Sequence, residues 1–294
     1  MKPIFASGNT AVITGGAGGV GLAIAQKCIG HGMKVLIVDR DTELLEAAKK
    51  DLGEAASTFE LDVGQVEGWE KLKAEITGSF GDMNNGTYTS QKLNAIDFKK
   101  GRIHLLVLNA GVGGQSSWQE LDSFRRILDT NLYGVINGVS SLLPLVGDGQ
   151  SVKSAVVITG SKQGITNPPG NPAYNASKAA VKSLAEHLSF DLRNTATSVH
   201  LLVPGWTFTG LSGSRSGAKK PAGAWTAEQV AEYLEHKMAV GLFYILCPDN
   251  EVTEELDRKR MLWSVGDIVE GRPPLSRWRE DYKEAAQAWI AKQQ

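Results

Sequence analysis

The chain has 294 residues, of which 42% are hydrophobic and 21% are charged. A chain of this length can bury a substantial core, and it lies near the upper length of a single α/β domain. Its 31 Lys and Arg residues against 32 Asp and Glu residues give a formal net charge of −1, so there is no global basic field of the kind that favours a nucleic-acid partner.

Cysteine use and hydropathy indicate the compartment. The two cysteines, Cys28 and Cys247, share no motif with each other or with nearby histidines, so we predict no metal site and a reduced, intracellular protein. No apolar run approaches the roughly 20 residues that span a bilayer, and the N-terminus lacks a secretory pattern. We therefore expect a cytoplasmic protein without a membrane partner.

The first strong pattern is typical of a phosphate-binding corner. Residues 10–14 read as a short buried strand, a glycine-rich turn follows, and residues 22–28 have a helical pattern. Glycines let the backbone approach a pyrophosphate, and the N–H groups at a helix start face its charge. Two glycine registers fit, and a purely structural glycine turn is the alternative. The candidate cofactor residues of this turn are Gly15, Gly18, Gly19, Val20 and Gly21.

The second strand, residues 34–39, ends in an acid that bears on the choice of cofactor. A carboxylate at Asp39 would accept hydrogen bonds from ribose hydroxyls and repel a 2′-phosphate. Arg40 follows directly, and a basic residue there can also meet a 2′-phosphate. Because Gly18 is not basic, the glycine turn gives NADP no support. We favour NAD, with NADP less favoured.

Helices and strands continue to alternate through the middle of the chain. We predict a helix over 42–52, a strand over 57–61 and a helix over 66–80. Residues 82–101 are polar and turn-rich where connections usually have a few residues, so they read as an insertion that forms a loop or short hairpin. A strand over 102–108 then ends in a turn of small residues, Asn109, Ala110 and Gly111, and the next helix contains Asn131.

A serine, a tyrosine and a lysine follow the fifth strand, residues 154–159. Prolines in the segment 164–173 predict a shaped loop there rather than a helix. In the long helix after it, Tyr174 and Lys178 share one face at i,i+4 spacing. The ammonium would lower the pKa of the phenol from about 10, so that Tyr174 could exchange a proton near neutral pH. Ser161 could hydrogen-bond the reacting oxygen.

The C-terminal third carries a further turn and a helical extension. A sixth strand, 198–203, leads into the turn that holds Pro204, Gly205, Thr207 and Thr209. The Gly/Ser-rich residues 210–224 are a candidate lid, with a loop of no function as the alternative. A capping box at Thr226 opens a helix to about residue 238, and 241–246 reads as the last strand. Residues 248–294 form the extension, with helices over 251–269 and 279–292 that we expect to pack on the domain or on a neighbouring subunit through Trp263, Trp278 and Trp289.

These motifs together resemble the short-chain dehydrogenase/reductase family of the compact Rossmann type, over about residues 8–210. The resemblance implies that Asp62 bonds the adenine amino group and that Val63 flanks the ring, although Asp62 could equally be a turn residue. It implies that Asn109, Ala110 and Gly111 approach the cofactor ribose, and that Asn131 bends its helix and holds a water connected to the lysine. The resemblance also implies that Lys178 binds the nicotinamide ribose, and that Pro204, Gly205, Thr207 and Thr209 contact the carboxamide or pyrophosphate.

The predicted fold is a doubly wound, mostly parallel seven-stranded sheet in a single domain, residues 1–294. The predicted reaction is reversible hydride transfer between NAD and a secondary alcohol or ketone, with Tyr174 as general acid/base and Asn131, Ser161 and Lys178 assisting. The alternatives are an NADPH-preferring carbonyl reductase and a non-catalytic nucleotide-binding regulator. By resemblance we expect a homodimer or homotetramer. Substrate identity does not follow from the sequence, although four side chains could line the pocket: Gln163, Trp118, Trp206 and Phe208.

Overall fold

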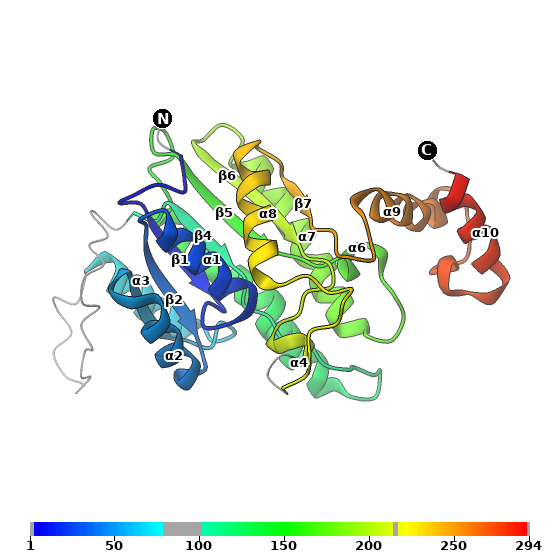
Figure 1. Ribbon diagram of the computed structural model, residues 1–294, viewed down its shortest axis with the longest axis horizontal. Coiled ribbons are helices and arrows are strands. Elements are labelled where there is room, and N and C mark those ends of the chain that lie inside the picture. The colour runs from blue at the N-terminus through cyan, green and yellow to red at the C-terminus, as the bar shows by residue number, and fades with distance from the viewer. Residues whose placement is uncertain (1–2, 79–101, 214–216, 293–294) are drawn as a thin grey trace.

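The computed structural model describes residues 3–78, 102–213 and 217–292, so the predicted insertion lies outside the described residues (Figure 1). The strands are β1 Thr10–Thr14, β2 Lys34–Asp39, β3 Ala56–Glu60, β4 Leu105–Leu108, β5 Ser154–Thr159, β6 Thr197–Val203 and β7 Tyr244–Leu246. The helices are α1 Gly19–Gly30, α2 Thr42–Leu52, α3 Val66–Thr77, α4 Leu121–Leu128, α5 Gly134–Leu142, α6 Gln163–Thr166, α7 Pro172–Asp191, α8 Ala227–Ala239, α9 Glu254–Val269 and α10 Glu280–Lys292.

The strands of the described chain form one seven-stranded sheet in the order β3-β2-β1-β4-β5-β6-β7, and every neighbouring pair is parallel. The strand order reverses direction between β1 and β4. In open parallel sheets, ligands bind outside the carboxyl ends of the strands at such a switch point. The order and the parallel pairing confirm the predicted doubly wound Rossmann fold.

Two apolar clusters cover the two faces of the sheet. Successive side chains of a strand point to opposite faces, so Ala11 and Ile13 of β1 join one cluster while Val12 joins the other. The first cluster packs against α1, α2 and α8, and the second packs against α3, α5 and α7. Burial on both faces explains why the strands read as continuous apolar runs rather than as alternating ones.

The segment between β5 and α7 differs from the prediction. Residues 164–173 were expected to exclude helix, yet α6 forms at Gln163–Thr166 and α7 already begins at Pro172. Proline is tolerated in the first turn of a helix, where its missing N–H has no intrahelical partner anyway. The bend between the two helices is made by Asn167, which lies in the left-handed region at φ 49°.

The C-terminal extension is helical, as predicted, and stands beyond the β7 edge of the sheet (Figure 1). Its two helices pack on each other through Trp263 and Trp289, whose rings meet edge-on with centroids 5.6 Å apart. Trp263 Nε1 also donates to Ser276 Oγ at 2.8 Å. None of the helices in the described residues is both long and apolar enough to cross a membrane.

Candidate active site

A cavity of about 520 Å³ opens at the carboxyl ends of the strands. Its walls come from the segments that follow six successive strands, β1 to β6, so the topology gathers residues far apart in the chain around one space. These lining residues are Gly15, Gly18, Gly19, Val20, Asp39, Arg40, Asp41, Leu61, Asp62, Val63, Asn109, Ala110, Gly111, Val112, Gly113, Arg126, Thr130, Thr159, Gly160, Ser161, Tyr174, Lys178, Pro204, Gly205, Thr207, Thr209, Gly210, Leu211 and Ser212.

The glycine turn after β1 is built so closely that side chains would not fit. Gly15 and Gly19 have φ values of 63° and 52°, which glycine adopts readily. A Cβ at Gly21 would lie 2.1 Å from Gly15 O, inside any permitted contact. Gly21 is therefore buried behind the turn rather than in the cavity wall, and it sets the close approach of α1 to the turn. Gly19 and Val20, at the N-terminus of α1, line the cavity, and the first N–H groups of a helix have no partner within the helix, so they suit an anionic ligand.

Asp39 presents a fixed carboxylate to the cavity. Its Oδ2 accepts from Ala17 N at 3.3 Å, and its Oδ1 accepts from Arg40 N at 2.8 Å and from Asp41 N at 3.3 Å. Backbone donors on both sides hold the group at the end of β2. Arg40 also lines the cavity, so the Asp39 carboxylate that favours NAD and the basic side chain that favours NADP lie at the same end of the site.

Thr14, the last residue of β1, organises the turn after β4. Its hydroxyl accepts from Asn109 N at 2.9 Å and from Ala110 N at 3.1 Å. Asn109 Nδ2 donates to Thr14 O at 3.2 Å, and Thr159 Oγ1 donates to Asn109 Oδ1 at 3.1 Å. The ends of β1, β4 and β5 are thus tied together below the cavity.

Ser161, Tyr174 and Lys178 meet on one wall of the cavity. The Ser161 side chain lies close enough to the Tyr174 hydroxyl to lower the pKa of the phenol. Lys178 Nζ donates to Thr159 O at 2.8 Å and lies 5.9 Å from the centroid of the Tyr174 ring. The loop between β5 and α7 and the first turns of α7 therefore bring together the three groups that the sequence placed apart.

Burial dominates the electrostatics of this triad. It raises the pKa of Tyr174 above its ordinary value of 10, and the hydrogen bond with Ser161 opposes this rise only in part. Burial also lowers the pKa of Lys178 from 10.5 to about 8. The prediction that the pKa of Tyr174 is lowered is therefore wrong for the protein chain alone, because removing the phenolate from water costs more than its neighbours return.

Asn131 lies behind the cavity wall rather than in it. It sits in a π-helical turn, Asp129–Tyr133, between α4 and α5, and its side chain is fully buried. Its Oδ1 accepts from Val112 N at 2.8 Å, and its Nδ2 donates to Val112 O at 3.0 Å and to Ser177 Oγ at 3.2 Å. Asn131 therefore joins the turn after β4 to α7, one residue before Lys178.

The predicted site residues fall into two groups, those that line the cavity and those that do not. All the predicted cofactor residues except Gly21 line the cavity, as do Ser161, Tyr174 and Lys178. The predicted substrate-side residues Gln163, Trp118, Trp206 and Phe208 are not among its lining residues, and Trp118 is 80% exposed.

Leu211 and Ser212, at the start of the predicted lid segment, line the cavity, as does Arg126, which sequence reasoning missed. A Cβ on Gly113 would lie 3.0 Å from Leu211 Cδ1, so Leu211 reaches across to the opposite wall. The described residues contain no group of three or more His, Cys, Asp or Glu side chains that could hold a metal ion.

Comparisons with known proteins agree with this geometry. The family described as short chain dehydrogenase matches residues 9–85 and 69–220. The oxidoreductase asL5 of Sarocladium schorii is 30% identical over 203 residues, covering 67% of this chain and 72% of the relative. The NADP-dependent (R)-specific alcohol dehydrogenase of Lentilactobacillus kefiri is 27% identical over 219 residues, covering 72% of this chain and 79% of the relative.

A solved structure extends the comparison to three dimensions. The crystal structure of a short chain dehydrogenase/reductase from Burkholderia phymatum in complex with NAD matches with a TM-score of 0.75 and 27% identity. The match covers 91% of this chain and 96% of that one.

Proposed function

This chain belongs to the short-chain dehydrogenase family, and we propose from that membership that it oxidises a secondary alcohol or reduces the matching ketone with a nicotinamide cofactor. The observation that supports the proposal best is that Ser161, Tyr174 and Lys178 line the same cavity as the glycine turn after β1. We call that turn, residues 15–21, the glycine corner. One wall offers acid/base groups, and the other offers backbone donors for phosphates.

The cavity suits a dinucleotide. The glycine corner cannot hold a side chain at Gly21, the N-terminus of α1 faces the space, and Asp39 offers a fixed carboxylate where a ribose would lie. In the proposed complex the corner holds the pyrophosphate, Asp39 holds the adenosine ribose, and Asp62 and Val63 hold the adenine. Lys178 holds the nicotinamide ribose, and Thr207 and Thr209 hold the carboxamide or pyrophosphate. A bound nicotinamide ring supplies the hydride acceptor or donor.

The chain's own residues manage the proton and the reacting oxygen. In the oxidation direction Tyr174 Oη accepts the hydroxyl proton of the alcohol, and in reduction it returns that proton. Ser161 Oγ donates a hydrogen bond to the same oxygen as charge develops on it. Because burial raises the pKa of Tyr174, the Lys178 ammonium has to offset part of that cost for the phenolate to form near neutral pH. Asn131 holds the turn at Val112 and supports a proton path towards solvent.

We propose NAD as the preferred cofactor, because the carboxylate of Asp39 is held in the cavity by backbone donors and would repel a 2′-phosphate. Arg40 lines the same end of the cavity and supports the alternative, an NADPH-preferring carbonyl reductase. The name of the similar alcohol dehydrogenase from Lentilactobacillus kefiri specifies NADP dependence, and this relative therefore supports the same alternative.

Tyr174→Phe tests the mechanism. A panel of secondary alcohols and ketones is first screened with the wild-type protein by NADH absorbance, with both NAD and NADP. The variant keeps the ring that fills the wall but loses the hydroxyl, so kcat should fall by about 10²- to 10⁴-fold, the usual contribution of a positioned acid/base. Binding of NADH, followed by fluorescence, should change little. Unchanged turnover in the variant would refute the role of Tyr174.

The same experiment separates the non-catalytic alternative. A wild-type protein that binds NADH but turns over no member of the panel would favour a nucleotide-binding regulator. A wild-type protein that binds neither NADH nor NADPH would overturn both the cofactor assignment and the reaction.

A further inference from the structure

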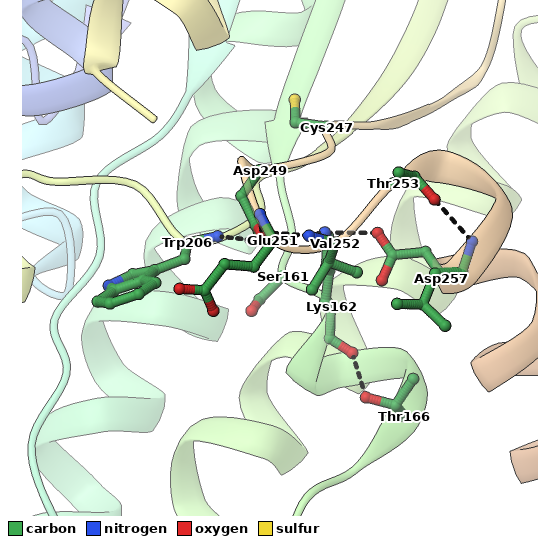
Figure 2. Close-up of polar contacts among 12 residues, drawn as sticks. Ser161, Lys162, Thr166, Trp206, Cys247, Asp249, Glu251, Val252, Thr253 and Asp257 are labelled. Atoms are coloured by element: carbon green, nitrogen blue, oxygen red, sulfur yellow. Dashed lines mark hydrogen bonds and ion pairs between the residues drawn. The ribbon is translucent and has the colours of Figure 1, made fainter. Parts of the chain in front are cut away.

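Lys162 directly follows Ser161, and its charge is buried rather than solvated. Its side chain is 16% exposed, and its Nζ contacts Asp257 of α9 and lies 3.6 Å from Asp249 (Figure 2). The side chains of these two acids are 3% and 6% exposed respectively. A lysine between two carboxylates in so little water is expensive to bury unless the charges compensate one another.

Asp249 ties the cluster to the turn after β6. Its Oδ2 accepts from Trp206 N at 3.1 Å, and its Oδ1 accepts from Glu251 N at 3.0 Å and Val252 N at 2.8 Å. Figure 2 shows the Asp249 carboxylate between the Trp206 backbone and the residues that lead into α9. The turn Pro204–Thr207, which forms one wall of the cavity, therefore depends on the position of this carboxylate.

Gly205 shows how closely the cluster lies behind that wall. A Cβ at Gly205 would be 2.9 Å from Lys162 Nζ and 2.9 Å from Asp249 Oδ2. Gly205 itself lines the cavity. The ammonium of Lys162 is thus separated from the cavity by the thickness of one glycine backbone.

Asp257 ties the cluster to the C-terminal extension. It is 2% exposed and lies in the first turns of α9, which is capped by Thr253 accepting from Leu256 N at 3.1 Å. The contact with Lys162 is an ion pair rather than an aligned hydrogen bond, since neither Lys162 Nζ nor Asp257 Oδ2 has a hydrogen-bond partner of good geometry in the described chain. Arg260 and Arg277 add positive charge near Asp257.

The backbone of Lys162 is the link to the catalytic groups. It caps α6, and its carbonyl accepts from Thr166 N at 2.9 Å and from Thr166 Oγ1 at 3.1 Å. The helix α6 contacts α9 on one side and α7 on the other. At the α7 contact a Cβ on Gly164 would lie 2.4 Å from the carbonyl carbon of Lys178, so the two backbones touch.

From these contacts we propose that Lys162 is a positioning residue, which uses its ion pairs with Asp257 and Asp249 to fix Ser161 against Tyr174 and to make α9 a support of the substrate side of the site. The proposal rests on the proposed function, because it assigns a supporting role to residues around the same reacting groups. It gives the C-terminal extension a part in catalysis. Without the ammonium, the loop that carries Ser161 loses its ion pairs with Asp257 of α9 and with Asp249, which holds the Pro204–Thr207 turn.

The test compares Lys162→Met with a matched control, Arg272→Met. Arg272 forms a buried ion pair at the other end of α9, with Nε 2.9 Å from Asp267 Oδ1 and side chains 12% and 9% exposed. Both substitutions remove one cation of a buried pair, so both should lower the melting temperature. Only Lys162→Met should lower kcat/KM for an alcohol that the wild type accepts, by on the order of 10²-fold, the loss typical of a reacting group misplaced by about 1 Å.

Two further readouts separate positioning from general damage. Loss of the Ser161 hydrogen bond should move the acidic limb of the kcat/KM profile for oxidation to higher pH, because that bond lowers the pKa of Tyr174. Lys162→Arg, which keeps the charge, should restore most of the rate. If Lys162→Met fails to fold, the double variant Lys162→Met/Asp257→Leu removes the Lys162–Asp257 pair, leaves Asp249 on its three backbone N–H donors, and should fold while staying slow.

The outcomes are distinct. Equal kcat/KM per folded molecule and an unchanged pH profile in Lys162→Met and Arg272→Met would overturn the proposal while leaving the proposed function intact. Failure of the wild type on the whole alcohol panel would instead overturn the proposed function. NADH affinity, measured by fluorescence, should fall less than threefold in Lys162→Met, because the glycine corner and Asp39 are untouched; a loss as large as the loss in kcat/KM would assign the cluster to cofactor binding and overturn its role at Ser161.

Discussion

Replacing Asp39 with asparagine tests the choice of cofactor, because the substitution removes a charge from the cavity and keeps the size of the side chain. The carboxylate is held by the backbone N–H groups of Ala17, Arg40 and Asp41, at 2.8 to 3.3 Å. It is therefore oriented before any ligand arrives, and little binding energy is lost in ordering it.

The expected magnitude follows from the loss of a charge-assisted hydrogen bond. Such a bond contributes about 1.5–3 kcal/mol, which corresponds to about a 10- to 100-fold change in affinity. Asp39→Asn should weaken NADH binding by that factor. It should also strengthen NADPH binding, because the repulsion of a 2′-phosphate disappears while Arg40 stays in the cavity wall.

The assay is a fluorescence titration of wild type and variant with NADH and NADPH at fixed ionic strength. Asp62→Asn is the control, since it removes the other carboxylate predicted to meet the adenosine half and should weaken both cofactors alike. A wild-type preference for NADPH would refute the reasoning about Asp39. So would an NADH/NADPH affinity ratio that Asp39→Asn leaves within about threefold of the wild-type value, well short of the tenfold that 1.4 kcal/mol represents.

Two further predictions concern stability and the glycine corner. Gly21→Ala should abolish measurable NADH binding and lower the melting temperature, because its Cβ would lie 2.1 Å from Gly15 O. The control is Gly30→Ala at the end of the same helix, where a Cβ would meet nothing within 4 Å. This control should leave NADH binding unchanged and should be neutral or stabilising for the melting temperature. Burial lowers the pKa of Lys178 from 10.5 to about 8, so between these pH values the unfolded chain binds more protons than the folded one, and this group adds stability as pH rises. The free energy of unfolding of wild type relative to Lys178→Met should therefore increase from pH 8 to pH 10, by less than about 1.4 kcal/mol per pH unit; a difference that is flat or falls with pH would contradict the assignment.

The fold was predictable because its signals are local and repeated. Apolar runs of strand length alternate with helical periods, and each small-residue turn falls where a strand ends. The strands 10–14, 34–39 and 154–159 have the predicted bounds. The segment after Ser161 was harder, because proline both excludes helix interiors and favours helix starts, and only the three-dimensional position of Pro172 decides between the two.

The site was predictable where family motifs exist and unpredictable where contacts come from distant segments. Glycines, Asp39, Tyr174 and Lys178 carry spacing signals. Lys162 carries no such signal, because its proposed role depends on contact with Asp257, which lies nearly a hundred residues later in the chain. The prediction of a lowered pKa for Tyr174 was wrong for the same reason, since burial depends on the folded wall of the cavity and not on the i,i+4 spacing.

The two buried cysteines can serve as probes of local opening of the fold. Cys28 in α1 and Cys247 after β7 are both fully buried, and burial raises the pKa of each thiol, that of Cys247 to about 12. Neither thiol should react with alkylating reagents until its surroundings open. Because Cys28 lies in α1 and Cys247 follows β7 within the same apolar cluster, their separate alkylation rates in native conditions would report the opening of that cluster at two different places.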